Sequence, residues 1–299
     1  MDHTIKKSIY ALAILWLLSF QCAIAQLQNN QATDTITTIL FKVTSPHTDN
    51  VSYLFGTHHA FGKEFFDSLN IAHQALASSQ IVIKENLNIP GQTAQDIINR
   101  RTNTTPWNKY LSNQDLAYIK NLFATSPTDY NKMTPTEMYT FLNRHFKQQV
   151  CLNKAADDTS LSLDDYIATK AVEQNIPLYG LETTQQQITL LNKDVERLPQ
   201  KNHKRRLSNI IKKIKNKNIN NCEETKWYAH MAIHYQLQAP CRNHLILTDR
   251  NALWMAQISQ KLQEKNCFIA VGLSHLMYSC GLINQLTQLG YTVTPVYLK

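Results

Sequence analysis

The sequence predicts an α/β (α+β) fold, with a central sheet built from the N- and C-terminal segments and a large helical insertion between them. Three observations support this prediction. Runs rich in β-branched and aromatic residues lie near both ends of the 299-residue chain, at about 35–83 and 267–297. The stretch between them, about 93–264, is polar and spaces its apolar residues as helices do. No internal repeat divides the chain, so one sheet supplied from both ends is the economical arrangement.

The opening third of the chain is expected to run strand, strand, helix, strand. The segments 35–43 and 51–55 are separated by turn-forming residues, which is typical of a hairpin. The segment 65–77 has apolar residues at helical spacing. The short apolar run 81–83 ends at Lys84-Glu85 and is typical of a buried strand.

The middle of the chain is expected to be helical, with one short strand at 177–180. Thr134 and Ser162 are suited to cap two of the helices at their N-termini, because their hydroxyl groups can accept a backbone N–H. The predicted helices cover 93–100, 114–123, 135–148, 163–175, 195–216, 223–236 and 245–264.

The last third returns to an alternation of strands and helix. A buried strand is predicted at 267–271, followed by a turn at 272–275 and a helix at 281–289. Gly290 is suited to end that helix, because glycine readily adopts the left-handed conformation found there. A final strand is predicted at 291–297.

The N-terminus has the order of a secretory signal peptide. Lys6 and Lys7 precede an apolar run at 9–20, and Ala23-Ile24-Ala25 supplies the small residues before a cleavage site. We therefore expect a signal peptide at 1–25, a single mature domain at 26–299, and export to the periplasm or secretion. The alternative is an uncleaved N-terminal anchor, which would be the protein's only contact with a membrane.

The net charge of the chain is +8, and much of the excess lies in the stretch 201–217. A solvated helix face explains this stretch, because no aromatic residues interleave with the charges for base stacking. A patch for nucleic acid or anionic lipid is the alternative. We expect no nucleic-acid partner.

Five cysteines follow the predicted signal peptide, and none forms a C-x-x-C pair. This spacing excludes a zinc ribbon and a thioredoxin-like motif. An exported protein can form disulfides, and the odd number leaves at least one thiol unpaired in the monomer. The sequence leaves the pairing open. The five are Cys151, Cys222, Cys241, Cys267 and Cys280.

Four ionisable side chains stand where predicted strands end. His59 closes the turn Gly56-Thr57-His58-His59, and His275 closes the similar turn at 272–275. Glu85 and Glu182 also follow short strands. Taken singly, each has an ordinary structural explanation. The carboxyl ends of parallel strands meet at one edge of a sheet, where α/β proteins place their ligands, so we expect these groups to converge.

The ordered motifs resemble those of a known family. They are Tyr53–His59, Glu85, Gly180–Thr183, Asp249–Asn251, Val271–Leu276 and Gly290–Val293. Together they resemble the TraB/GumN family, which is similar to the Tiki Wnt-inactivating metalloproteases. The resemblance covers nearly the whole mature chain. It implies an α/β fold with a helical insertion and an active site made of His59, His275 and Glu85. Glu182 and Arg250 also match family positions.

The resemblance implies a hydrolytic chemistry for these residues. His59, Glu85 and His275 would bind a divalent metal ion (Mn²⁺, Co²⁺ or Zn²⁺), because two imidazoles and a carboxylate form an open catalytic ligand set. Glu182 would act as general base and Arg250 would hold an oxyanion or a substrate carboxylate. In a version without metal, Glu85 or Glu182 activates water and the histidines transfer protons. His58 departs from the family pattern, and we expect it to point away because neighbours on an extended segment alternate.

The sequence thus predicts an exported hydrolase, with a metal-dependent peptidase as its specific form, acting on a peptide or small-molecule substrate. No organic cofactor is expected. The alternative is a non-catalytic ligand- or partner-binding protein of the cell envelope. His230 and His234 have the spacing of a zinc-protease helix, but the glutamate that would be the base is replaced by Met231, so we place them on an ordinary helix face.

Overall fold

The computed structural model describes residues 36–155 and 160–298, and Ile36–Lys299 form one compact unit. Its centre is a six-stranded sheet in the order β4-β3-β5-β2-β1-β6. Strands β4, β3, β5 and β2 are parallel neighbours, whereas β1 pairs antiparallel with β2 and with β6. The strands are β1 (Leu40–Thr44), β2 (Val51–Thr57), β3 (Ile81–Asn86), β4 (Leu178–Glu182), β5 (Cys267–Gly272) and β6 (Thr292–Val296).

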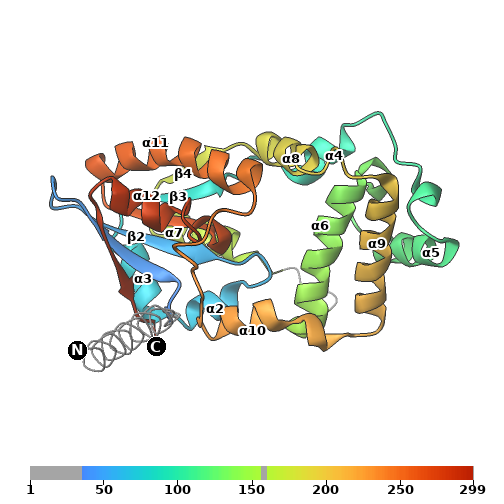
Figure 1. Ribbon diagram of the computed structural model, residues 1–299, viewed down its shortest axis with the longest axis horizontal. Coiled ribbons are helices and arrows are strands. Elements are labelled where there is room, and N and C mark those ends of the chain that lie inside the picture. Colours follow the sequence, from blue (N-terminus) through green and yellow to red (C-terminus); the bar gives the residue numbers. More distant parts are fainter. Residues whose placement is uncertain (1–35, 156–159, 299) are drawn as a thin grey trace, which may run out of the picture. The chain divides into compact units, whose positions relative to one another are not determined.

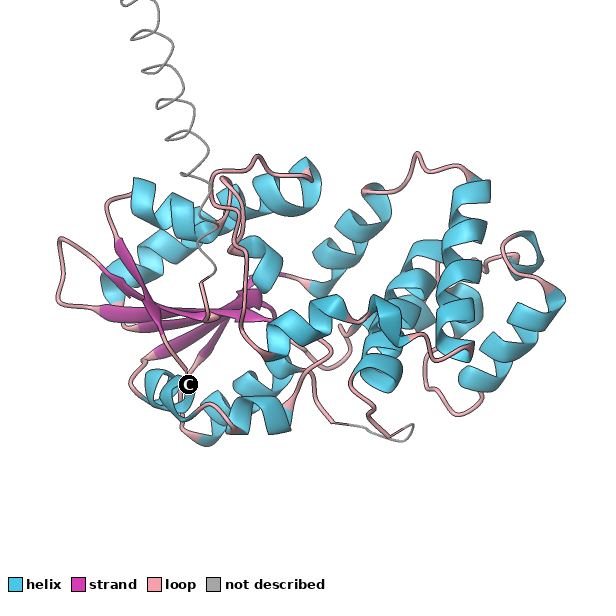
Figure 2. Cartoon of the chain, turned by 60° about the horizontal axis from the view of Figure 1, so that its bottom comes forward, coloured by secondary structure: helices cyan, strands magenta, loops and turns pink. Residues whose placement is uncertain are grey.

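This sheet confirms the predicted α/β fold class. Strands from both ends of the chain, coloured blue and red in Figure 1, share the sheet, and β5 lies between β2 and β3. Residues Ile81–Ile83 of β3 and Cys267–Val271 of β5 are apolar and buried. Parallel strands covered on both faces are apolar along their length in this way. Helices accordingly lie on both sides of the sheet (Figure 2).

The helices follow the predicted order with changed boundaries. The α-helices are α2 (Lys63–Asp67), α3 (Asn70–Ala77), α4 (Ala94–Asn99), α5 (Asn113–Leu122), α6 (Pro135–Phe146), α7 (Leu163–Glu173), α8 (Thr184–Lys193), α9 (Gln200–Lys215), α10 (Glu223–Ala229), α11 (Asp249–Glu264) and α12 (Leu282–Gln288). Short 3₁₀ segments are η1 (Trp107–Lys109), η2 (Tyr130–Lys132), η4 (Ile219–Asn221) and η6 (Leu273–His275). Single π turns are η3 (Lys147–Cys151) and η5 (His244–Thr248).

Side-chain caps begin several of these helices. Thr134 accepts the backbone N–H of Glu137 at α6, and Ser162 accepts that of Asp165 at α7, as the sequence predicts. Thr93 caps α4 in the same way. Each such cap satisfies a donor that the first helical turn leaves without an intrahelical partner.

Two groups of apolar side chains fill the interior. The larger lies around the sheet and takes residues from α2, α3, α7, α11 and α12. The smaller lies between α5, α6 and α9, and Met138, Leu142 and Ile211 are central to it. Helices α6 and α9 stand side by side there (Figure 1). The stretch 93–264 therefore divides its apolar residues between the two groups.

Three predicted helices are wrong in extent. The helix expected over 65–77 is two helices, because Leu69 leaves helical geometry with φ −109° and ψ 72°. The helix expected over 223–236 ends at Ala229, and Met231 adopts a left-handed φ of 57°. His230 and His234 therefore do not share a helix face.

The third correction concerns the segment expected as one helix over 195–216. That helix begins only at Gln200, after Pro199, and the preceding α8 was not predicted. Proline supplies no backbone N–H and is tolerated before or at the first helical turn, which explains the later start.

Two disulfides join segments that are distant in the sequence. Cys151 pairs with Cys222, and Cys241 pairs with Cys280. Cys267, buried in β5, is the one free cysteine of the described residues. The predicted signal peptide at 1–25 lies outside those residues. In residues 36–155 and 160–298, no helix combines the length and apolar character needed to span a bilayer.

Candidate active site

The two Gly-x-x-His turns meet at the carboxyl edge of the sheet. Strands β2 and β5 are neighbours in register, with Thr57 opposite Gly272 at their ends. A Cβ atom on Gly56 would lie 2.6 Å from Cδ1 of Leu273, which belongs to the second turn. The hydroxyl of Tyr228 donates a 2.8 Å hydrogen bond to the carbonyl of Gly56. The missing side chain at Gly56 therefore lets the turns pack against each other.

His59 is the exposed member of the site. Its side chain is 58% exposed, and its Nδ1 lies 2.7 Å from Oδ2 of Asp164, a buried residue in the first turn of α7. The charge of Asp164 raises the pKa of His59 to about 9. Since the carboxylate accepts at Nδ1, the Nε2 atom of His59 is left to face outward.

Asp164 is hydrogen-bonded to two residues of the first Gly-x-x-His turn, Thr57 and His59. Burial alone would raise its pKa, but the charge of His59 and hydrogen bonds from His59 and Thr57 lower the pKa below its ordinary value. Asp164 is therefore an ionised acceptor beneath the imidazole. A carboxylate that fixes one ring nitrogen also fixes the direction in which the other points.

His58 turns to a different partner. Its Nδ1 accepts the backbone N–H of Ala60 at 3.2 Å, so its Nε2 carries the proton that is donated to Oε1 of Glu224 at 3.2 Å. Burial lowers the pKa of His58. The imidazole therefore plays no part in the His59–Asp164 pair, as the alternation along an extended segment predicts.

Arg250 joins the buried charges of the site. The Nε and Nη2 groups of Arg250 donate to both carboxylate oxygens of Glu182, at 3.2 and 2.5 Å. Nη2 also donates to Oε2 of Glu85 at 3.1 Å. Nη1 donates to Nε2 of His275 at 3.1 Å and to the carbonyl of Ile246 at 3.5 Å. All five N–H donors of Arg250 therefore have a partner within the protein.

This arrangement bears on the anion-holding role predicted for Arg250. The side chain is 10% exposed, and its guanidinium lies 4.5 Å from the centre of the Trp254 ring. Binding a substrate oxyanion would require one of its existing bonds to break. In this structure Arg250 instead positions the two glutamates and His275.

Glu85, in β3, lies beside the second turn. Its Oε1 accepts the backbone N–H of Gly272 at 2.8 Å, and its Oε2 accepts from Gln187 at 2.9 Å as well as from Arg250. Burial would raise the pKa of Glu85, but the neighbouring His275, Arg250 and His59 lower it. The carboxylate is therefore ionised. A carboxylate oxygen offers two lone pairs, so Oε1 retains one beyond the bond to Gly272.

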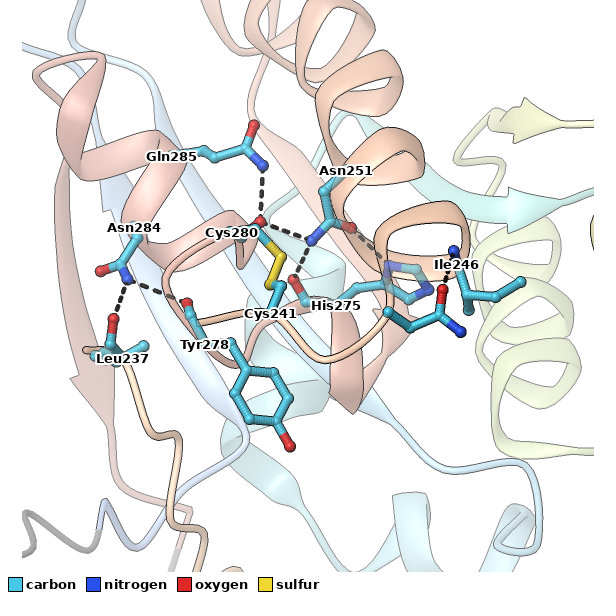
Figure 3. Close-up of a disulfide and its surroundings, with 10 residues drawn as sticks. Leu237, Cys241, Ile246, Asn251, His275, Tyr278, Cys280, Asn284 and Gln285 are labelled. Atoms are coloured by element: carbon cyan, nitrogen blue, oxygen red, sulfur yellow. Dashed lines mark hydrogen bonds between the residues drawn. A yellow bond between two sulfur atoms is a disulfide. The ribbon is translucent and has the colours of Figure 1, made fainter. Parts of the chain in front are cut away.

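Asn251 sets the proton position on His275. The amide nitrogen of Asn251 donates to the carbonyls of His275 and Cys280, at 3.1 and 2.9 Å (Figure 3). Its Oδ1 must therefore be the acceptor for Nδ1–H of His275, at 2.6 Å. Burial lowers the pKa of His275 to about 4, so the ring is neutral at pH 7. The Cys241–Cys280 disulfide lies beside this contact (Figure 3).

The predicted metal ligands do not share a coordination point in this arrangement. The Nε2 lone pair of His275 faces the cationic guanidinium of Arg250, where a metal ion would be repelled. Nδ1 of His59 is committed to Asp164. In the described part of the chain, no three His, Cys, Asp or Glu side chains form a group that could hold a metal ion.

The structure thus brings four of the five predicted site residues into one hydrogen-bonded group: Glu85, Glu182, Arg250 and His275. His59 lies apart from that group on Asp164, and its charge still lowers the pKa of Glu85. Sequence reasoning missed Asp164 and gave Asn251 no role. One signal in the sequence could have drawn attention to Asp164. Of the two adjacent aspartates at the start of α7, Asp165 bonds to the capping residue Ser162, so Asp164 is available for a different partner.

A family model described as TraB/PrgY/gumN family matches residues 39–295. The match covers nearly the whole chain, including β1 to β5, most of β6 and every predicted site residue. No curated protein matched the chain, and no solved structure did. The extent of the family match decides the assignment: this chain belongs to the TraB/PrgY/gumN family.

Proposed function

We propose that the chain is an exported hydrolase that cleaves an acyl bond in a peptide or small-molecule substrate at the carboxyl edge of its sheet. One observation carries the proposal. The exposed imidazole of His59 is oriented by the buried carboxylate of Asp164, close enough to Glu85 for its charge to lower the pKa of that group. A positioned acid beside an ionised carboxylate is the arrangement that general acid–base hydrolysis needs.

The proposed roles follow from the protonation states. His59, protonated at neutral pH, donates its Nε2 proton to the leaving group. Oε1 of Glu85, which keeps a free lone pair, accepts a proton from the attacking water. A carbon–oxygen bond forms as the bond to the leaving group breaks. Arg250 is a positioning residue here, since it touches Glu85 and Glu182 but offers no unused donor.

Export is supported by the cysteines. Two disulfides are formed among the described residues. Disulfides persist in oxidising compartments such as the periplasm and the extracellular space. Together with the signal-like N-terminal sequence, they favour a protein that works outside the cytoplasm.

A metal-dependent peptidase is the second form of the proposal. A histidine whose Nδ1–H is bound by a carboxylate is the usual form of a metal-binding histidine, and His59 has this form with Asp164. Metal binding would displace the proton that otherwise occupies Nε2. Arg250 would then have to release Nε2 of His275 before that residue could join as a ligand.

A cleavage screen tests the proposal and separates its two forms. The exported protein, purified after expression of the full chain, is incubated with a peptide library, with and without EDTA and then with added Mn²⁺, Co²⁺ or Zn²⁺. Replacing His59 by Gln removes the proposed acid. His47→Gln, in the exposed β1–β2 loop, is the matched control.

The proposal expects cleavage that survives in His47→Gln and falls at least a hundredfold in His59→Gln, the range typical of a lost acid–base group. Loss in EDTA with recovery on metal addition would select the metal-dependent form. Equal cleavage by both variants would refute the assigned site. No cleavage under any condition would favour the non-catalytic binding protein.

A further inference from the structure

A polar pocket of about 520 Å³ lies between α6, α9 and the start of α10, and none of the residues assigned above to hydrolysis lines it. Its wall includes Tyr139 and Lys147 on the α6 side, and Arg206, Lys212 and Lys213 on the α9 side. Five asparagine side chains complete most of the polar lining, and Glu224 supplies the one carboxylate. The volume is within the range of pockets that hold small molecules, about 300–1,000 Å³.

The lining follows from helix periodicity. Arg206 and Lys213 are seven residues apart, about two turns, so they project from nearly the same side of α9. The apolar residues of that helix, including Leu207 and Ile211, are buried in the smaller apolar group. The basic stretch 201–217 was predicted to be a solvated helix face. Most of it lies on α9, but part of the polar face of that helix lines a concave site.

A disulfide joins two of the segments that line the pocket. Cys151 ends the π turn that begins at Lys147, and Cys222 precedes Glu224 by two residues. The disulfide between these cysteines ties the end of the α6 segment to the start of α10. A binding site whose walls are already joined loses less conformational entropy when a ligand binds.

The charges in the pocket are not balanced within the protein. Glu224 is committed to Lys147 at 2.7 Å and to His58 at 3.2 Å. In residues 36–155 and 160–298, no carboxylate pairs with Arg206, Lys212 or Lys213, whereas Lys215 on the same helix has Asp115 at 3.1 Å. Three cations therefore face the pocket without a counter-charge.

The guanidinium of Arg206 stacks on the ring of Tyr139. Its guanidinium carbon lies 4.1 Å from the centre of the Tyr139 ring. None of its N–H groups donates a hydrogen bond to an acceptor in the described residues. A stacked guanidinium keeps its planar edge available for the paired oxygens of a carboxylate or phosphate.

We propose that this pocket binds a small ligand with a phosphate group attached to a hydroxyl-bearing body, such as a sugar phosphate. Three unneutralised cations suit an anionic phosphate, and the asparagine amides and Tyr139 suit hydroxyl groups and the face of a sugar ring. The same chemistry is presented by a free sugar phosphate and by the headgroup of an anionic phospholipid. The site is distinct from the hydrolase proposal and does not depend on it.

Calorimetric titration of the exported full chain tests this site, with glucose 6-phosphate as the probe and glucose as the uncharged control. Vesicles of phosphatidylglycerol, compared with phosphatidylcholine, form the lipid arm. Lys213→Ala removes one pocket cation. Lys204→Ala is the matched control, because nine residues at 100° each place Lys204 on the opposite side of α9, outside the pocket.

The proposal expects saturable binding of glucose 6-phosphate or of phosphatidylglycerol vesicles, and the arm that binds identifies the source of the phosphate. Lys213→Ala weakens that binding about tenfold or more, while Lys204→Ala retains it. Equal melting temperatures of the two variants show that both are folded. Absence of binding in both arms, or equal weakening by Lys204→Ala, would overturn the proposal, since the latter would indicate a diffuse charge effect.

Discussion

Arg250 is the residue on which the buried half of the candidate site depends. It is the only cation bonded to Glu85 and Glu182 among the described residues, and it also occupies Nε2 of His275. Removing one partner of a buried ion pair leaves an uncompensated charge, which costs about 3–5 kcal/mol. We therefore predict that Arg250→Met lowers the free energy of unfolding by about that amount in urea denaturation.

Two further variants make this prediction specific. Arg250→Lys keeps the charge but loses the paired geometry, so an intermediate loss is expected. In the triple variant Arg250→Met, Glu85→Gln, Glu182→Gln, neutral amides replace the uncompensated carboxylates, and part of the stability returns. Wild-type stability in Arg250→Met alone would show that the network contributes nothing to folding.

At the residue scale, the sequence predicts the charged groups but not their partners. Glu85, Glu182, Arg250 and His275 are identifiable because each stands in a short motif. Asp164 lies in a helix about a hundred positions from His59, and only the fold brings the two together. The role of Asn251 likewise depends on the direction of its amide, which follows from two backbone carbonyls in the second turn.

At the scale of elements, Gly56 and Leu273 couple the two turns. A methyl group on Gly56 would meet the Leu273 side chain at 2.6 Å, and overpacking of this kind costs about 1–3 kcal/mol. We predict that Gly56→Ala destabilises the protein by that amount in urea denaturation. In a Leu273→Ala background the same substitution costs clearly less, because the obstructing side chain is gone.

Additive effects in this double-mutant cycle would contradict the interlocking of the turns. A useful control is Gly91→Ala, since a Cβ there meets nothing within 4 Å and any loss reflects its positive φ of 77° alone. That loss should be the same with Leu273 or Ala at position 273.

The sequence predicted a segment for each of the six strands, whereas three predicted helices were wrong in extent, for a physical reason. The buried strands β3 and β5 are short apolar runs whose ends are marked by polar residues or glycine. The break between α2 and α3 follows from the backbone of Leu69, a residue with no breaking tendency of its own. The chain after Ala229 similarly leaves the helix to pair Ile233 with Ile36, a contact between residues distant in sequence.

At the scale of the whole molecule, each disulfide belongs to a different part of the structure. Cys241–Cys280 holds the loop after His275, and Cys151–Cys222 ties the helices around the smaller apolar group. Sequence separations of 39 and 71 residues give similar chain-entropy contributions, about 4 kcal/mol each.

We predict that replacing either cysteine pair by serine lowers the melting temperature by a similar amount. Only the Cys241/Cys280 variant should speed amide hydrogen exchange in η6 and around Asn251, because Cys280 supplies a carbonyl to that side chain. Faster exchange there in the Cys151/Cys222 variant would show that the two parts are not independent.

The fold class and the order of the strands along the chain could be predicted from the sequence. The apolar runs at both ends of the chain need other apolar segments to bury them, which one shared sheet provides. The division of the helices between two apolar groups could not be predicted from the sequence. The apolar faces of α6 and α9 bury each other, and their spacing does not indicate which helix each one packs against.

The pH dependence of hydrolysis tests the site most directly, once the cleavage screen has supplied a substrate. Asp164 raises the pKa of His59 to about 9, and the proposed acid works only when protonated. The rate should therefore hold through neutral pH and fall as the pH rises through about 9. In Asp164→Asn the falling limb should move toward about 6.5, the ordinary histidine value. A limb that stays in place in Asp164→Asn, or full activity in His59→Gln, would contradict the account.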